Sequence, residues 1–131
     1  MSARLSVLIL CVVLLAACNG GTVDRHALTN DSATIDSVAC EGALLAHNVS
    51  AGRTTANFAR EQADALRIQA SNFADALASR PTSASLERRV RAKGAEAGRL
   101  AQTLTRLHDD PSNKQLASTI ATQLAHLGGC A

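Results

Sequence analysis

Residues 48–55, Asn-Val-Ser-Ala-Gly-Arg-Thr-Thr, decide how many helices this chain forms. They have low overall helix propensity, yet they lie in the middle of a long apolar stripe with spacings of three and four residues. The stripe consists of Ile35, Val38, Gly42, Leu45, Val49, Gly52, Ala56, Ala59, Ala63, Leu66, Ala70, Phe73 and Leu77. It predicts helix over 34–79, either continuous or broken near 48–53.

Two further helices are expected after this stripe. Arg80-Pro81 ends the first helical region, because proline disfavours helical backbone in the residue before it. A second stripe predicts helix over 83–108, and Asp110 with Pro111 predicts the cap and start of a third helix over 111–127, which Gly128-Gly129 ends. The expected caps of the first two helices are Ser32 or Thr34 and Thr82 or Ser83.

The composition agrees with an all-α fold of one domain. Of the 131 residues 26 are Ala, only two are Phe, and Trp and Tyr are absent, so any core is thin. The prediction is an antiparallel helical hairpin or bundle of three helices, or of four helices if the first one breaks. An all-β fold is excluded by the scarcity of β-branched clusters.

The first 18 residues carry a targeting signal. A short basic start is followed by the apolar run 5–15, which is too short to span a membrane, and then by Leu15-Ala16-Ala17-Cys18. These four residues resemble the lipobox of bacterial prolipoproteins. The resemblance implies a signal peptide over 1–17, cleavage before Cys18 and attachment of diacylglycerol to the Cys18 thiol. An ordinary secretory signal cut after Ala17 is the alternative.

The resemblance also predicts where the protein lies and how its domain is tethered. It implies a lipid anchor at the extracytoplasmic side of the cell membrane, or at the outer membrane of a Gram-negative organism, since Asn19 is not an inner-membrane retention signal. The polar, glycine-containing residues that follow predict a lipidated N-terminus and flexible tether over 18–33, ahead of a helical domain over 34–131.

Cys40 and Cys130 are the two cysteines that remain after Cys11 leaves with the signal and Cys18 carries lipid. In an exported protein of this size, a disulfide between them is the expected state. The alternatives are two free or intermolecular thiols, or a metal site in which His47 and His126 join the cysteines.

The expected disulfide restricts the arrangement of the helices. A continuous first helix would extend about 60 Å from Cys40 to Arg80. Cys130 reaches Cys40 if the later helices run back along it in one direction, kinked at Pro111, or if the first helix folds over at 48–52 and a four-helix bundle forms. The first arrangement keeps the stripe unbroken and is slightly preferred.

Charge is distributed unevenly along the chain. Residues 80–99 have a net charge of +4, whereas residues 24–41 have a net charge of −3. We expect the basic segment to lie far from the anchor, where Arg88, Arg89, Arg91 and Lys93 would bind an anionic cell-wall polymer or an acidic envelope protein. Ordinary solvated helix surface is the simpler interpretation. Nucleic acid is not an expected partner, because aromatic side chains for base stacking are lacking.

No recognisable catalytic motif or cofactor-binding fingerprint is present in the sequence. The expectation is therefore a non-enzymatic envelope lipoprotein without a cofactor, which presents a helical interaction surface. The alternative is a small carrier or sensor that holds an apolar ligand or a metal ion in the envelope.

Overall fold

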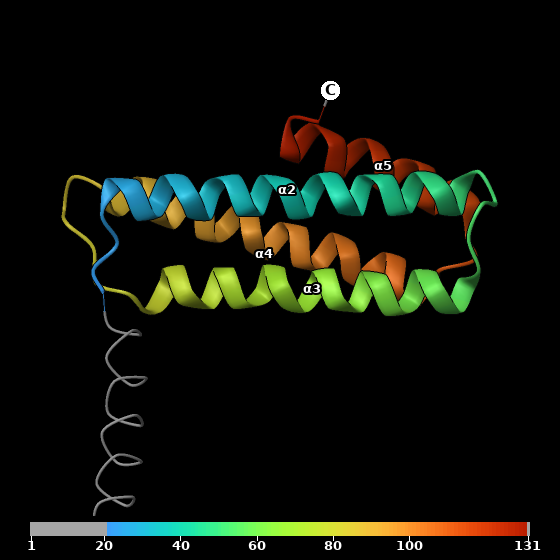
Figure 1. Ribbon diagram of the computed structural model, residues 1–131, viewed down its shortest axis with the longest axis horizontal. Coiled ribbons are helices and arrows are strands. Elements are labelled where there is room, and N and C mark those ends of the chain that lie inside the picture. Colours follow the sequence, from blue (N-terminus) through green and yellow to red (C-terminus); the bar gives the residue numbers. More distant parts are fainter. Residues whose placement is uncertain (1–20, 131) are drawn as a thin grey trace, which may run out of the picture.

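The computed structural model of this protein describes residues 21–130, and within them the chain forms four helices (Figure 1). Their bounds are α2 Arg25–Ser50, α3 Ala56–Ser79, α4 Glu87–Asp109 and α5 Lys114–Gly128. The all-α prediction is confirmed. The signal segment and Cys18 lie outside the described residues, so the lipobox stays a prediction.

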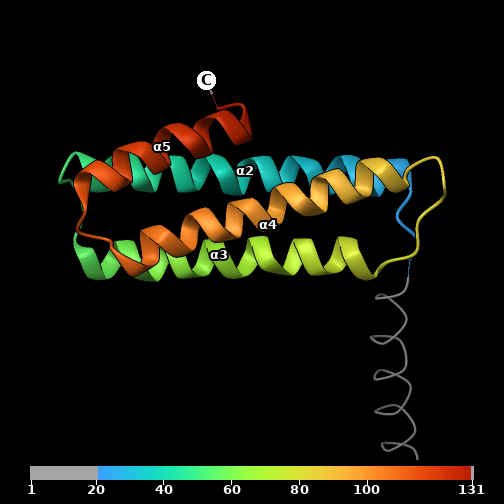
Figure 2. The same cartoon turned by 180° about the vertical axis from the view of Figure 1, so that it is seen from behind.

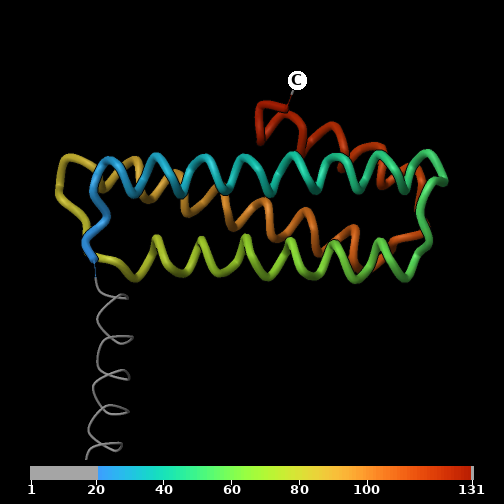
Figure 3. The backbone as a smooth tube through the Cα atoms, in the orientation of Figure 1, coloured from blue at the N-terminus to red at the C-terminus, as the bar shows by residue number. Residues whose placement is uncertain are grey.

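The four helices run alternately in opposite directions. α2 and α4 run one way, α3 and α5 run back, and the same arrangement is seen from behind in Figure 2. The closest pairs are α3 with α4 and α2 with α5. Since α5 has only 15 residues, it covers roughly half of α2, which has 26. The result is a bundle in which α5 is a short outer helix (Figure 3).

The first helical region breaks at 51–55, so the four-helix alternative is correct and the preferred continuous helix is wrong. Gly52 adopts a positive φ of 69°, which a residue without Cβ reaches at little cost. Thr55 then accepts a hydrogen bond from the backbone N–H of Phe58 and caps α3. A low-propensity segment that contains both a left-handed glycine and a cap reverses the chain here.

The core is made of aliphatic side chains, chiefly Ala and Leu. Among residues 21–130 no polar or charged residue is buried. On α3, Ala59, Ala63 and Ala70 are completely buried, and their small size lets α4 approach closely. Gly42 on α2 lies where Leu104 of α4 and Leu124 of α5 meet. The expectation of an Ala-rich core is confirmed.

The start of the helical domain differs from the prediction. Residues 25–33, predicted as tether, are the first turns of α2, and Asp24 rather than Ser32 or Thr34 caps it. Val23 and Leu28 are buried in the core. The prediction failed because the segment is polar, although Leu28 lies one heptad before Ile35 and so continues the stripe backward.

Two other helix starts also differ. α4 has no side-chain cap, and the carbonyl oxygen of Ser83 accepts the backbone N–H groups of Leu86 and Glu87 instead. α5 is capped by Asn113, whose side chain accepts from Leu116, while Asp110 ends α4. Pro111 therefore lies in the turn rather than at the first helical position. At the other end of α5, Gly129 is left-handed, as the Gly128-Gly129 pair predicts.

Candidate functional site

Three segments meet at one end of the bundle, where α2 begins, α3 ends and α4 begins (Figure 1). The backbone N–H of Val23 donates to the carbonyl of Pro81 at 2.8 Å, and Val23 and Thr82 form a single parallel β-bridge. Val23 is only 2% exposed. These contacts hold the chain that enters the domain against the loop between α3 and α4. We call residues 22–25 and 81–91 together the basic end.

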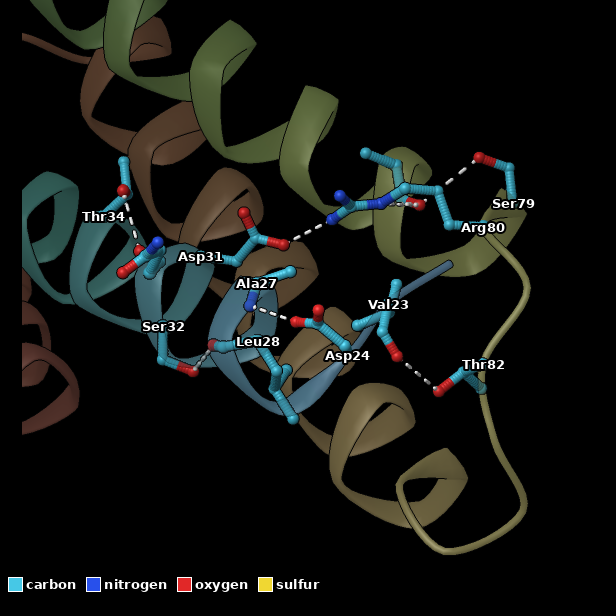
Figure 4. A network of polar contacts seen from close by, with 12 residues as sticks. Val23, Asp24, Ala27, Leu28, Asp31, Ser32, Thr34, Ser79, Arg80 and Thr82 are labelled. Carbon is cyan, nitrogen blue, oxygen red and sulfur yellow. Dashed lines mark hydrogen bonds and ion pairs between the residues drawn. The ribbon is translucent and has the colours of Figure 1, made fainter. Parts of the chain in front are cut away.

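Ion pairs also join the acidic segment 24–41 to the basic segment 80–99 in this region. Arg80 at the end of α3 forms an ion pair with Asp31 on α2, as Figure 4 shows together with the contacts of Val23 and Asp24. Lys93 on α4 pairs with Asp36 on α2 at 3.3 Å. The predicted polarisation along the length is therefore wrong, because the first helix reverses at Gly52 and returns the basic segment to the beginning of α2.

The four predicted anion-binding residues do not all belong to one surface. Lys93 lies between Asp36 and Glu96, and Arg91 pairs with Glu87 within α4. Arg88 and Arg89 are exposed, and neither has an ion-pair partner among residues 21–130. The structure removes Lys93 from the predicted set and leaves Arg88 and Arg89 as its free members.

The surroundings of Lys93 also affect its protonation. Partial burial by itself lowers the pKa of the ammonium group, but the hydrogen bonds and charges of Glu96 and Asp36 outweigh this and raise the pKa above its ordinary value. Because the pKa is higher in the folded than in the unfolded chain, the ammonium group stabilises the fold below about pH 10.4 and loses this effect as the pH rises through the raised value. Lys93 is thus a charged structural group at neutral pH.

Two shallow grooves lie next to each other at the basic end. One, of about 590 Å³, is lined by Ala84, Ser85, Glu87, Arg88, Arg89 and Arg91. The other, of about 480 Å³, is lined by residues 22–25, 81–83, 85 and 86. They share Ser85, so Arg25 at the start of α2 and the arginines of α4 belong to one continuous surface. Sequence reasoning missed Arg25, because no local pattern relates it to α4.

Cys40 and Cys130 form the predicted disulfide, with their Cα atoms 5.6 Å apart. The bond joins the middle of α2 to the residue that follows the left-handed Gly129. His47 and His126, the other members of the alternative metal site, are exposed. Within residues 21–130, no group of three His, Cys, Asp or Glu side chains is placed to bind a metal ion. Cysteines joined in a disulfide provide no thiolate for a metal.

Comparisons of the chain with protein-family models, curated proteins and solved structures found no match. None of the helices within residues 21–130 combines the length and the apolar character needed to cross a membrane. Any statement about function therefore depends on the residues of this chain alone.

Proposed function

We propose that this protein is a lipid-anchored, non-enzymatic lipoprotein of the bacterial envelope whose helical bundle presents an interaction surface. The observation that carries the proposal is Leu15-Ala16-Ala17-Cys18 directly after a short apolar run, which resembles the prolipoprotein lipobox. A diacylated cysteine anchors a protein through two acyl chains, and two membrane-binding signals are what stable anchoring requires.

The Cys40–Cys130 disulfide supports this proposal independently of the lipobox. Disulfides persist mainly in proteins exported to an oxidising compartment, which is where a lipoprotein domain is delivered. The same bond argues against the alternative function, a metal carrier or sensor, because that function would use the two cysteines as thiolate ligands.

Lipid attachment can be tested with the Cys18→Ser variant in bacteria grown with labelled palmitate. We expect the wild-type protein to carry the label and to remain with the membrane fraction, and the variant to lose the label because it lacks the thiol that is alkylated. Label incorporation is measured after immunoprecipitation.

The matched control is Cys11→Ser, which removes a cysteine of the signal segment and should leave labelling unchanged. Equal labelling of the Cys18→Ser variant and the wild type would refute the proposed anchor. Loss of label in the Cys11→Ser variant but not in the Cys18→Ser variant would equally contradict it.

A further inference from the structure

The position of the basic end relative to Cys18 is set by a short length of chain. Val23 is the fifth residue after Cys18, so an extended chain places the two Cα atoms at most about 18 Å apart. The backbone N–H of Val23 donates a hydrogen bond to the carbonyl of Pro81. The side chain of Thr82 donates a hydrogen bond to the Val23 carbonyl (Figure 4). Because Pro81 and Thr82 contact Val23, the start of the loop 81–86 also stays close to Cys18, whereas the opposite end of the bundle is separated from Cys18 by the length of α2.

The basic end carries more arginines than carboxylates. Its two grooves carry Arg25, Arg88, Arg89 and Arg91 against the carboxylates of Asp24 and Glu87. Asp24 already caps α2, and Glu87 is held by Arg91. Arg25, Arg88 and Arg89 are exposed, and no ion pair engages them among residues 21–130.

Helix stability does not explain Arg88 and Arg89. They occupy the first turn of α4, where the helix dipole favours negative charge and disfavours cations. A first turn with two arginines and one glutamate runs against this preference. Residues that disfavour the local helix and make no compensating contact are typical of a surface that serves binding.

We propose that the basic end rests on anionic phospholipid headgroups of the membrane that holds the lipid anchor. The proposal depends on the proposed function, because the anchor at Cys18 brings this end to the membrane surface. Arg25, Arg88 and Arg89 then face lipid phosphates, and the bundle is oriented with the loops 51–55 and 110–113 away from the membrane. A distal wall polymer, one of the two partners expected from the sequence, fits poorly with a basic segment at the membrane-proximal end.

The orientation can be measured on the full lipidated protein reconstituted in vesicles. Each arginine near an anionic surface raises the ratio of docked to undocked orientations by about fivefold. A fluorophore on Ser85→Cys reports the basic end, and one on Ser112→Cys reports the opposite end, both attached without reductant so that the disulfide stays intact. The quencher is a lipid with a nitroxide headgroup, and the vesicles are either pure phosphatidylcholine or equal parts phosphatidylcholine and phosphatidylglycerol.

We expect the Ser85 fluorophore to be quenched more strongly on the anionic vesicles, with the difference lost at about 1 M salt, where the Debye length is about 3 Å. The Ser112 fluorophore should be quenched weakly on both. In the Arg88→Glu/Arg89→Glu variant, the ratio of docked to undocked protein should fall by about 25-fold or more. It should keep its fold, because glutamates at a helix N-terminus are favourable.

The matched control is Arg53→Glu/Arg60→Glu, which makes the same change of charge at exposed positions of the opposite end and should leave quenching unchanged. Equal quenching of the Ser85 fluorophore on both kinds of vesicle, or equal effects of the two double variants, overturns this inference while the anchor stands. A wild-type protein that fails to float with pure phosphatidylcholine vesicles has no lipid anchor, and this outcome overturns the proposed function together with the inference.

Discussion

Gly128 lets the end of α5 lie directly on α2. A Cβ atom at this position would come within 2.7 Å of the backbone oxygen of Asp36 and 2.9 Å of the Cys40 sulfur. The first of these neighbours is backbone and cannot move aside as the end of a flexible side chain can. Gly98 on α4, by contrast, has open space around the place where its Cβ would be.

The Gly128→Ala variant should therefore be less stable than the wild type by about 1–3 kcal/mol, as expected for overpacking. The matched Gly98→Ala variant should be more stable by about 0.5–1 kcal/mol, because alanine is the better helix former in an uncrowded position. Urea unfolding followed by circular dichroism measures both. Equal effects of the two substitutions would mean that α5 does not lie on α2 as described.

At the scale of the elements, each helix start is set by whichever residue can accept the unpaired N–H groups of the first turn. Asp24 performs this role for α2, since its carboxylate accepts from the backbone N–H of Ala27 at 2.7 Å. Thr34, expected as a cap, lies inside the helix, and its hydroxyl donates to the carbonyl of Asn30.

Alanine substitutions at Asp24 and Thr34 should therefore change the stability of the fold in opposite directions. The Asp24→Ala variant should lose about 1 kcal/mol through loss of the cap. The Thr34→Ala variant should gain about 0.5 kcal/mol, because alanine has the higher propensity within a helix. Thermal unfolding measures the difference. If Thr34→Ala destabilised the fold and Asp24→Ala left its stability unchanged, the helix would begin at residue 34, as the sequence predicted.

At the scale of the whole molecule, the disulfide connects the end of the described chain to the middle of its first helix. Cys40 lies ten residues before the end of α2, and α5 runs back from that end over 15 residues. At a rise of 1.5 Å per residue, α5 is long enough to bring Cys130 beside Cys40. The bond closes a loop of 90 residues and fastens a short helix that packs mainly against α2.

Reduction of this bond, or the Cys130→Ser substitution, should destabilise the fold by about 4–5 kcal/mol on the loop-entropy estimate. The melting temperature should fall by many degrees, while the helical signal at low temperature is retained because the core is unchanged. Circular dichroism melts with and without reductant measure this, and thiol titration verifies the redox state. The Cys40→Ser/Cys130→Ser double variant is the control, because reductant should not affect it. A wild-type melting curve that reductant leaves unchanged would show that the bridge does not stabilise the fold.

The apolar stripes and the end of α5 could be predicted from the sequence, because each depends on residues a few positions apart, whereas the expected caps of the helices were wrong. The stripes from Ile35 to Leu77 and from Leu86 to Leu107 predicted the helices, and Gly128-Gly129 predicted the end of α5. The disulfide followed from a count of cysteines in an exported chain. The lipobox at 15–18 depends on four adjacent residues in the same way, and it stays a prediction until lipid attachment is measured.

The relation between distant segments was decided only by the tertiary structure. Low helix propensity at 48–55 opposes a continuous helix and the apolar stripe through it favours one, so the local pattern does not decide whether the chain continues or reverses at Gly52. The reversal nevertheless determines which end of the bundle holds the arginines of α4, and which of them are neutralised. Packing of α2 against α4 pairs Lys93 with Asp36 and leaves Arg88 and Arg89 free at the end where the domain begins. A periodic pattern within one helix does not specify such contacts, because Lys93 and Asp36 are 57 residues apart and meet only when the helices between them reverse direction.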